Sequence, residues 1–288
     1  MKMMILDKKM SSLFNHWDTE DKKVLHHICK DNVLNTKLDI KNKKESNDFC
    51  GIIVDGRDRN WNTIEDYCAI KSFKLFSKGN YPVFVFSHNN VDFLNNEFSL
   101  LDQWRITLIE IPKLNNLFEY SKFCIEELYF RIPEEFENIL TFQSDGFLYK
   151  NGWEKFVLDN NFDLIGAHWF HFAAIMFKEN DKYFDFPFQP TNVGNGAFSF
   201  RRASKMRKIS SMFSKLDLIE KGNPDFKPPL EDLFYFYFGY GSGICKKPTL
   251  QQCCNFSRDP INLNTYLSKK SYGFHRPVDK NFFCCRVH

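Results

Sequence analysis

The sequence predicts an α/β fold with a doubly wound, mostly parallel sheet and helices on both faces. One observation is a series of short apolar segments rich in β-branched and aromatic residues, at residues 51–55, 81–87, 107–111, 137–143 and 162–167. Another is that segments with helical spacing separate several of these strands. Strands that alternate with helices form parallel sheets, and nearly continuous apolar strands are typical of burial on both faces.

The remaining elements follow from the same patterns. Apolar residues recur at helical spacing in residues 61–77, 117–130 and 153–159, and residues 202–215 form a basic helix. The segment 230–238 fits a helix or an aromatic strand, and residues 181–191, with two prolines, fit a loop. Residues 1–47 are polar and lysine-rich, with a possible short helix at 21–29, so we expect an N-terminal arm before one domain at 48–288.

Composition excludes several classes of protein. The net charge of +3 over 288 residues gives no concentrated basic character, so we expect no nucleic-acid partner. No run of about 20 apolar residues occurs, so we expect no membrane span. The 33 phenylalanines follow the strand and helix patterns, which indicates that they fill the core.

The cysteines and the N-terminus predict a cytoplasmic protein. The first ten residues contain no apolar signal segment, and the nine cysteines are an odd number, which favours reduced thiols. Six C-terminal residues offer zinc ligands in principle, but no Cys-x-x-Cys spacing supports a site. They are Cys245, Cys253, Cys254, Cys284, Cys285 and His288.

Polar residues stand where the predicted strands end. Parallel strands place their carboxyl ends at one edge of a sheet, and ligands bind in the crevice outside that edge. The residues that the sequence places there are Asp55, Gly56 and Arg57 after the first strand, Ser87 after the second, and Gln143, Ser144, Asp145 and Gly146 after the fourth.

Asp145 is the candidate metal ligand. Residues two apart on a strand point to the same face, so Gln143 and Asp145 project together. A carboxylate beside a neutral oxygen suits Mg²⁺ or Mn²⁺ bridging two phosphates. The alternative is that Asp145 caps the following helix or serves the turn before Gly146.

The second candidate element is Gly194-Asn195-Gly196, which opens a strand ending in Arg201 and Arg202. Glycines at this spacing let a backbone approach a ligand, but they also suit a tight hairpin turn. An arginine at the far end of the strand is able to meet an anion, and alternation lets only one of the two face the site.

Two further candidates lie toward the C-terminus. Glu231 and Asp232 follow two prolines, where acids favour a helix N-terminus but also suit a general base. His275 follows an aromatic residue and precedes an arginine in a C-terminal segment. A lone histidine is more often structural, but this ring is also able to complete a metal shell or donate to a phosphate.

The ordered set of these motifs resembles a little-characterised family of GT-A-type glycosyltransferases. The motifs that carry it are the Gln143-Ser144-Asp145-Gly146 run, the Asp163-Leu164-Ile165-Gly166-Ala167-His168-Trp169 run, the Gly194-to-Arg201 run, the Glu231-Asp232 pair and Gly273-Phe274-His275. The resemblance covers residues 52–277.

The resemblance implies a GT-A-like fold and sugar transfer from a nucleotide-diphosphate donor, UDP- or GDP-linked, to a hydroxyl of a glycan or protein. It implies that Asp145 and His275 bind Mn²⁺ or Mg²⁺ and that Glu231 or Asp232 is the base of an inverting reaction. The nucleotide and its phosphates would meet Asp55, Gly56, Arg57, Ser87, Gln143, Ser144, Gly194, Asn195, Gly196 and Arg201. Residues 48–150 would then be the nucleotide-binding half and 151–288 the acceptor half.

Several residues depart from that family pattern. Gln143 replaces the first acid of an Asp-x-Asp motif, His168 replaces a proline, and Ala197 replaces a second glycine. Two other functions are therefore alternatives: a sugar nucleotidyltransferase, although the loop after the first strand lacks the expected glycine- and lysine-rich pattern, and a non-catalytic glycan-binding module.

Overall fold

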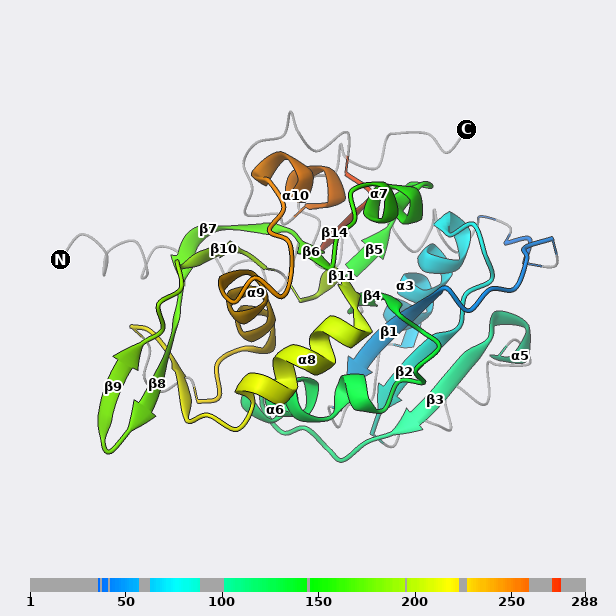
Figure 1. Ribbon diagram of the computed structural model, residues 1–288. Coiled ribbons are helices and arrows are strands. Elements are labelled where there is room, and N and C mark those ends of the chain that lie inside the picture. Colours follow the sequence, from blue (N-terminus) through cyan, green and yellow to red (C-terminus); the bar gives the residue numbers. More distant parts are fainter. Residues whose placement is uncertain are drawn as a thin grey trace, which may run out of the picture.

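The computed structural model describes residues 36–56, except Lys37 and Lys41, together with residues 63–88, 101–143, 146–194, 196–222, 227–258 and 271–275. Strands and helices alternate through its first half (Figure 1). In chain order the elements there are β1 (Phe49–Asp55), α3 (Thr63–Phe76), β2 (Val83–Ser87), α5 (Leu101–Trp104), β3 (Ile106–Glu110), α6 (Leu117–Glu126), η1 (Leu128–Phe130), β4 (Asn138–Phe142), β5 (Gly146–Leu148), α7 (Trp153–Asp159) and β6 (Leu164–Gly166).

Short strands are frequent in the second half, which carries the remaining helices. Its elements are β7 (His168–Ala173), β8 (Ile175–Glu179), β9 (Lys182–Asp185), β10 (Thr191–Val193), β11 (Phe198–Arg202), α8 (Ala203–Phe213), β12 (Leu218–Glu220), α9 (Glu231–Gly241), α10 (Leu250–Phe256), β13 (Ser257–Arg258) and β14 (Gly273–His275).

The central sheet has six strands in the order β3-β2-β1-β4-β11-β6. The β1, β2, β3 and β4 strands pair in parallel, while β11 runs antiparallel to both of its neighbours, β4 and β6. The prediction of a mostly parallel sheet is therefore confirmed. The antiparallel β11 places its first residue, Phe198, beside Phe142 at the carboxyl end of β4, and this brings the preceding glycine segment to that edge.

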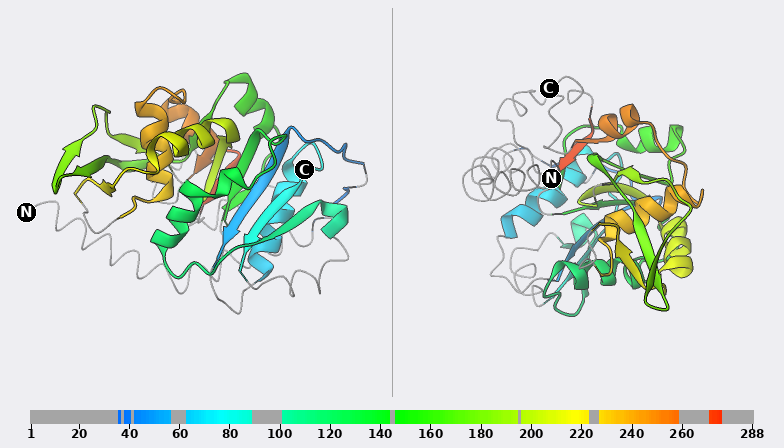
Figure 2. Two further views of the ribbon diagram at one scale, coloured as in Figure 1. Left: turned by 60° about the horizontal axis from the view of Figure 1, so that its bottom comes forward. Right: turned by 90° about the vertical axis from the view of Figure 1, so that its left-hand side faces the viewer.

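Helices cover both faces of this sheet, as the doubly wound prediction requires (Figure 2). On one face the α3 residue Phe73 stacks on Phe142, and Trp153 of α7 packs edge-on against Phe49. On the other face α6, η1, α8 and α9 pack together, and Phe123 of α6 meets the β2 residue Phe86. Phenylalanine supplies much of both interfaces, as the sequence predicts.

The segment 230–238, for which the sequence fits either a helix or an aromatic strand, belongs to the helix α9 from Glu231 onward. Six consecutive residues, Leu233 to Phe238, are buried, with exposed fractions of 2% or less. A helix that is apolar all round is buried on every side, so its sequence carries no amphipathic period. This is why the pattern also fits an aromatic strand.

Residues 181–191 differ from the predicted loop, because they contain β9 and the start of β10. The β8–β9 hairpin projects from the side of the molecule opposite α5 (Figure 1). Its turn residues, Asn180 and Asp181, have φ angles of 48° and 61°, the left-handed values that two-residue hairpin turns need. The Asn-Asp pair was the available signal for this hairpin.

The end of the predicted N-terminal arm packs against the domain. Ile40 is 5% exposed and belongs to the core. The Lys43 ammonium donates to the carbonyl oxygens of Lys74, Leu75 and Ser77 at the C-terminus of α3, where the exposed carbonyls favour a cation. The predicted helix at 21–29 lies outside the described residues.

Candidate functional site

Three loops meet at the carboxyl edge of the parallel strands. The β3–α6 loop crosses the ends of β1 and β2, since the Ile111 N–H donates to the Ser87 carbonyl at 3.0 Å and the Leu114 N–H to the Gly56 carbonyl at 2.7 Å. A Cβ at Gly56 would lie 2.3 Å from the Leu114 side chain, so this crossing needs glycine. The predicted residues Asp55, Gly56 and Ser87 are thus placed along one edge, while Arg57 lies outside the described residues.

The ends of the predicted metal-binding turn are fixed by the backbone. The Gln143 N–H donates to the Ala197 carbonyl at 2.9 Å, and the Gly146 N–H donates to the Gln143 carbonyl at 2.9 Å. A Cβ at Gly146 would lie 2.5 Å from the Ala197 oxygen, which excludes larger residues. The residues between these ends, Ser144 and Asp145, lie outside the described part of the chain.

The C-terminal β14 strand pairs with β5 and brings the other predicted metal ligand to the same turn. In the antiparallel register, His275 is opposite Gly146, the residue that follows Asp145. The side chain of His275 is not among the described ones. Within the described residues no group of three or more His, Cys, Asp or Glu side chains is arranged to hold a metal, so the metal site stays a prediction.

The glycine segment before β11 is not a hairpin turn, because β10 pairs with β7 while β11 pairs with β4 and β6. Gly194 has a φ of 151°, and its N–H donates to the Ala167 carbonyl at 2.9 Å. A Cβ at Gly196 would lie 2.0 Å from a carboxylate oxygen of Glu231. The segment therefore needs glycine for close approach to the N-terminus of α9, and Asn195 between them lies outside the described residues.

Arg201 and Glu231 form a buried ion pair next to Gly196. The guanidinium of Arg201, on β11, donates to the two oxygens of Glu231 at 2.7 and 3.3 Å. It also donates to the Tyr129 hydroxyl at 3.0 Å and the Ser199 hydroxyl at 2.9 Å, and it lies 5.3 Å from the ring of Tyr235. Arg201 is 1% exposed, so the anion that it meets in the structure is Glu231.

The neighbouring Arg202 faces the other way, as strand alternation predicts. Its side chain donates to the Asn161 amide oxygen at 2.9 Å and lies 3.8 Å from Asp163. This leaves Arg201 as the arginine that points toward α9 and the candidate site.

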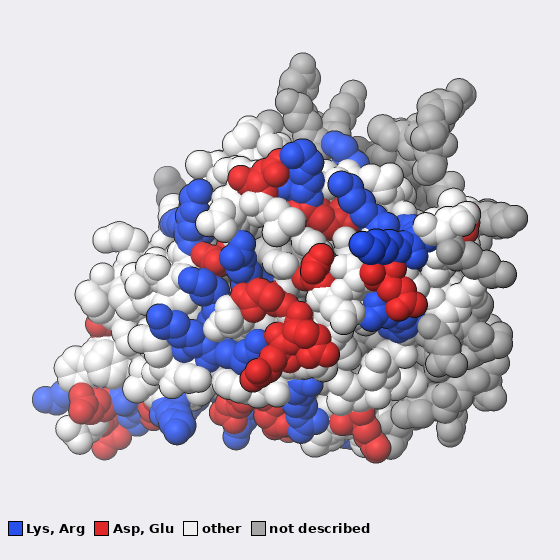
Figure 3. Space-filling model, turned by 45° about the vertical axis from the view of Figure 1, so that its right-hand side comes forward, with Lys and Arg blue, Asp and Glu red and all other residues white. Residues whose placement is uncertain are grey.

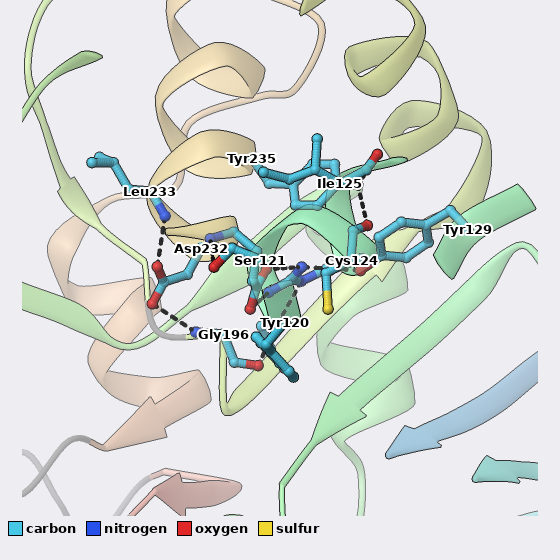
Figure 4. Close-up of polar contacts among 12 residues, drawn as sticks. Tyr120, Ser121, Cys124, Ile125, Tyr129, Gly196, Asp232, Leu233 and Tyr235 are labelled. Atoms are coloured by element: carbon cyan, nitrogen blue, oxygen red, sulfur yellow. Dashed lines mark hydrogen bonds and ion pairs between the residues drawn. The ribbon is translucent and has the colours of Figure 1, made fainter. Parts of the chain in front are cut away.

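Asp232 lies next to Glu231 but in a different environment. It is partly exposed, and its carboxylate accepts from the Leu233 N–H at 2.7 Å and lies 3.5 Å from the Gly196 N–H (Figure 4). Burial of the carboxyl group and the nearby Glu231 charge raise the pKa of Asp232 to about 7. The two acids that the sequence leaves equivalent are thus distinct: Glu231 is held by Arg201, and Asp232 is the partly exposed residue, with a carboxylate that contacts backbone N–H groups.

Sequence reasoning missed the contribution of α6 to this site. Ser121 accepts the Glu231 N–H at 3.2 Å, and the Tyr120 hydroxyl accepts an N–H of the Gln143 amide at 3.2 Å. Both residues lie inside a segment whose helical period is clear, but nothing in that period distinguishes a residue facing a site from one facing the core.

Cys50, Cys124, Cys245, Cys253 and Cys254 are free thiols. Basic and acidic side chains are interspersed over the face shown in Figure 3. In the described part of the chain, no helix combines the length and apolar character that crossing a membrane requires.

Comparison with known proteins gives a family and distant structures. A family model described as "Protein of unknown function (DUF5672)" matches residues 103–275, more than half of the chain. No curated protein matches the sequence. Similar solved structures include mouse xyloside xylosyltransferase 1 in its apo form, at 13% identity and a TM-score of 0.42, covering 79% of this chain and 96% of that one. Another is 4-diphosphocytidyl-2C-methyl-D-erythritol synthase from Anaerococcus prevotii, at 9% identity and a TM-score of 0.40, covering 69% and 84%.

Proposed function

We propose that this chain, which belongs to the family described as "Protein of unknown function (DUF5672)", is a glycosyltransferase that uses a nucleotide-diphosphate sugar. The observation that carries the proposal is the state of Asp232. The pKa of this carboxyl group is about 7, the residue is partly exposed, and its carboxylate contacts Gly196, just before β11 at the carboxyl edge of the mostly parallel sheet. Ligands of such sheets bind at that edge, and a base works best when its pKa is near the working pH.

In the proposed reaction, the Asp232 carboxylate takes the proton of an acceptor hydroxyl. The hydroxyl oxygen forms a bond to the anomeric carbon of the donor sugar, and the bond from that carbon to the diphosphate breaks. The nucleoside diphosphate leaves with the bonding electrons, and the configuration at the anomeric carbon inverts. General bases of this kind contribute about 10²- to 10⁴-fold to a rate.

The other residues of the edge have supporting parts in this proposal. The Arg201–Glu231 pair fixes the first turn of α9, which carries Asp232. Gly194 and Gly196 leave room beside that turn, because a Cβ at either position would contact α9. These residues orient the base and shape the space in which the acceptor is placed.

A divalent cation belongs to the proposal as a bound group. The residues that would hold it are Asp145 and His275, and the pairing of His275 with Gly146, the residue after Asp145 in the sequence, supports this choice. When bound, Mn²⁺ or Mg²⁺ would neutralise charge that develops on the leaving diphosphate. The proposal keeps the donor, acceptor and location that the sequence predicts. These are a UDP- or GDP-linked sugar, a hydroxyl of a glycan or protein, and the cytoplasm.

The experiment that tests this function is a thermal-shift panel followed by product analysis. UDP-, GDP-, CMP- and dTDP-sugars are each added with Mn²⁺, with Mg²⁺ and with chelator. We expect one donor class to raise the melting temperature, since a ligand that binds the native state stabilises it. That donor should then release nucleoside diphosphate when a glycan acceptor is added.

Two other results would favour a different function. Release of pyrophosphate from a nucleoside triphosphate and a sugar phosphate would assign a nucleotidyltransferase. Stabilisation by glycans but by no nucleotide sugar would assign a binding module and contradict the proposal.

A further inference from the structure

Gln143 is held at the carboxyl end of β4 with its side chain beside α6. Both backbone polar groups of Gln143 are paired, its N–H with Ala197 and its carbonyl with Gly146. The residue is partly exposed. Its position in the turn is therefore fixed, and what remains variable is the direction of the side-chain amide, which has a donor end and an acceptor end.

The donor end of this amide faces inward. The Gln143 Nε2 atom lies 3.2 Å from the hydroxyl of Tyr120, in the first half of α6. No described residue donates to the Gln143 Oε1 atom. The acceptor end of the amide is consequently the end that is left for a ligand.

The surroundings of Tyr120 explain this direction. Burial, together with nearby Cys124 and Glu231, raises the pKa of Tyr120 well above its usual range, so the phenol keeps its hydrogen. A phenol has one hydrogen and two acceptor lone pairs. One lone pair of the phenol oxygen accepts the Gln143 N–H at 3.2 Å.

We infer that Tyr120 is a positioning residue that holds the Gln143 amide with its carbonyl oxygen toward the ligand. The Tyr120 hydroxyl accepts from the nitrogen of the amide and so sets the direction of the amide. Residue 143 thereby presents an acceptor, which suits a sugar or ribose hydroxyl or a cation and does not suit a bare phosphate oxygen. The inference rests on the proposed function, because it assigns a part to Tyr120 in binding the donor.

The test compares donor affinity with stability in four proteins: wild type, Tyr120→Phe, Gln143→Ala and the double variant. The probes are UDP-glucose and GDP-mannose, each with Mn²⁺ and with chelator, titrated by calorimetry. A matched control is Tyr240→Phe, which removes another hydroxyl hydrogen bond, 2.9 Å to the Leu164 carbonyl, away from Gln143.

We expect Tyr120→Phe to raise the Kd of the bound nucleotide sugar at least fivefold, because the freed amide turns away from its ligand-binding direction. Gln143→Ala should raise the Kd by a similar factor, and the double variant should show no further loss, because Tyr120 acts through Gln143. Tyr240→Phe should lower the melting temperature as much as Tyr120→Phe does and leave the Kd unchanged.

The outcomes separate this inference from the proposed function. If wild type binds a nucleotide sugar and Tyr120→Phe binds it equally well, or if the losses of the single variants add in the double variant, the inference fails alone. If wild type binds neither these nucleotide sugars nor any in the wider panel, the proposed function fails and the inference fails with it.

Discussion

The two ends of the central sheet both carry titratable groups with shifted pKa values, yet the groups differ in access and in partners. At the carboxyl edge, burial and Glu231 raise the pKa of the Asp232 carboxyl group to about 7, and the residue is partly exposed. At the amino edge, burial together with Arg105 and Lys43 lowers the pKa of Lys74 to about 6, but Lys74 is 1% exposed.

The partners of these groups show the same difference. The Lys74 amine donates to the Tyr81 carbonyl and to the Asn80 side chain at 3.2 Å, so its hydrogens are used inside the protein. Among the described residues, the hydrogen bonds that the Asp232 oxygens accept come from the backbone N–H groups of Gly196 and Leu233. A shifted pKa therefore does not identify a functional site by itself, and access to the group decides between a site and the core.

The largest effect that we expect comes from the buried pair at the carboxyl edge. Glu231→Ala removes the carboxylate partner of Arg201, which is 1% exposed. The free energy of unfolding should therefore fall by about 3–5 kcal/mol. Chemical denaturation of both proteins measures this difference. Glu119→Ala is the matched control, because Glu119 is also an acid in the first turn of a helix but is not buried. This control variant should lose far less stability than Glu231→Ala. Equal losses of stability in the two variants would contradict the expected difference between the buried Glu231 and the partly exposed Glu119.

A smaller effect is expected at the amino edge, in the pH dependence of stability. Lys74 has a pKa of about 6 in the folded protein and 10.5 as an unperturbed group, so between these values the unfolded chain binds more protons. Wild type should gain stability relative to Lys74→Met as the pH rises from 7 to 9, by up to about 1.4 kcal/mol per pH unit. Urea unfolding at pH 7, 8 and 9 measures the gain. Parallel curves for the two proteins would show that Lys74 is charged when folded.

Most of the central sheet was predictable from the sequence, because its strands are apolar runs that carry their own signal. The segments at 51–55, 81–87, 107–111 and 137–143 are the parallel strands β1 to β4. The insertion of β11 between β4 and β6 was not predictable, since pairing between distant strands leaves no local pattern. The three-residue strands of the second half are too short for a period of two to be recognised.

The candidate site was predictable as a set of positions but not as a set of roles. The motifs place Gly196, Arg201, Glu231 and Asp232 near one another, and the structure brings them together. Sequence alone does not tell Glu231 from Asp232, because the difference is the partner that each acid meets across the fold. Tyr120 was missed for the same reason, since its contact with Gln143 joins residues 23 positions apart.

The measurement that tests the central claim most directly is the pH dependence of kcat/KM for sugar transfer, in wild type and in Asp232→Asn. The claim is that the Asp232 carboxylate is the base, so wild type should lose activity tenfold per unit as the pH falls below about 7 and should level off above it. Asp232→Asn should be about 10²- to 10⁴-fold slower and should lack this inflection. An Asp232→Asn enzyme with near-normal turnover and the same inflection would contradict the claim.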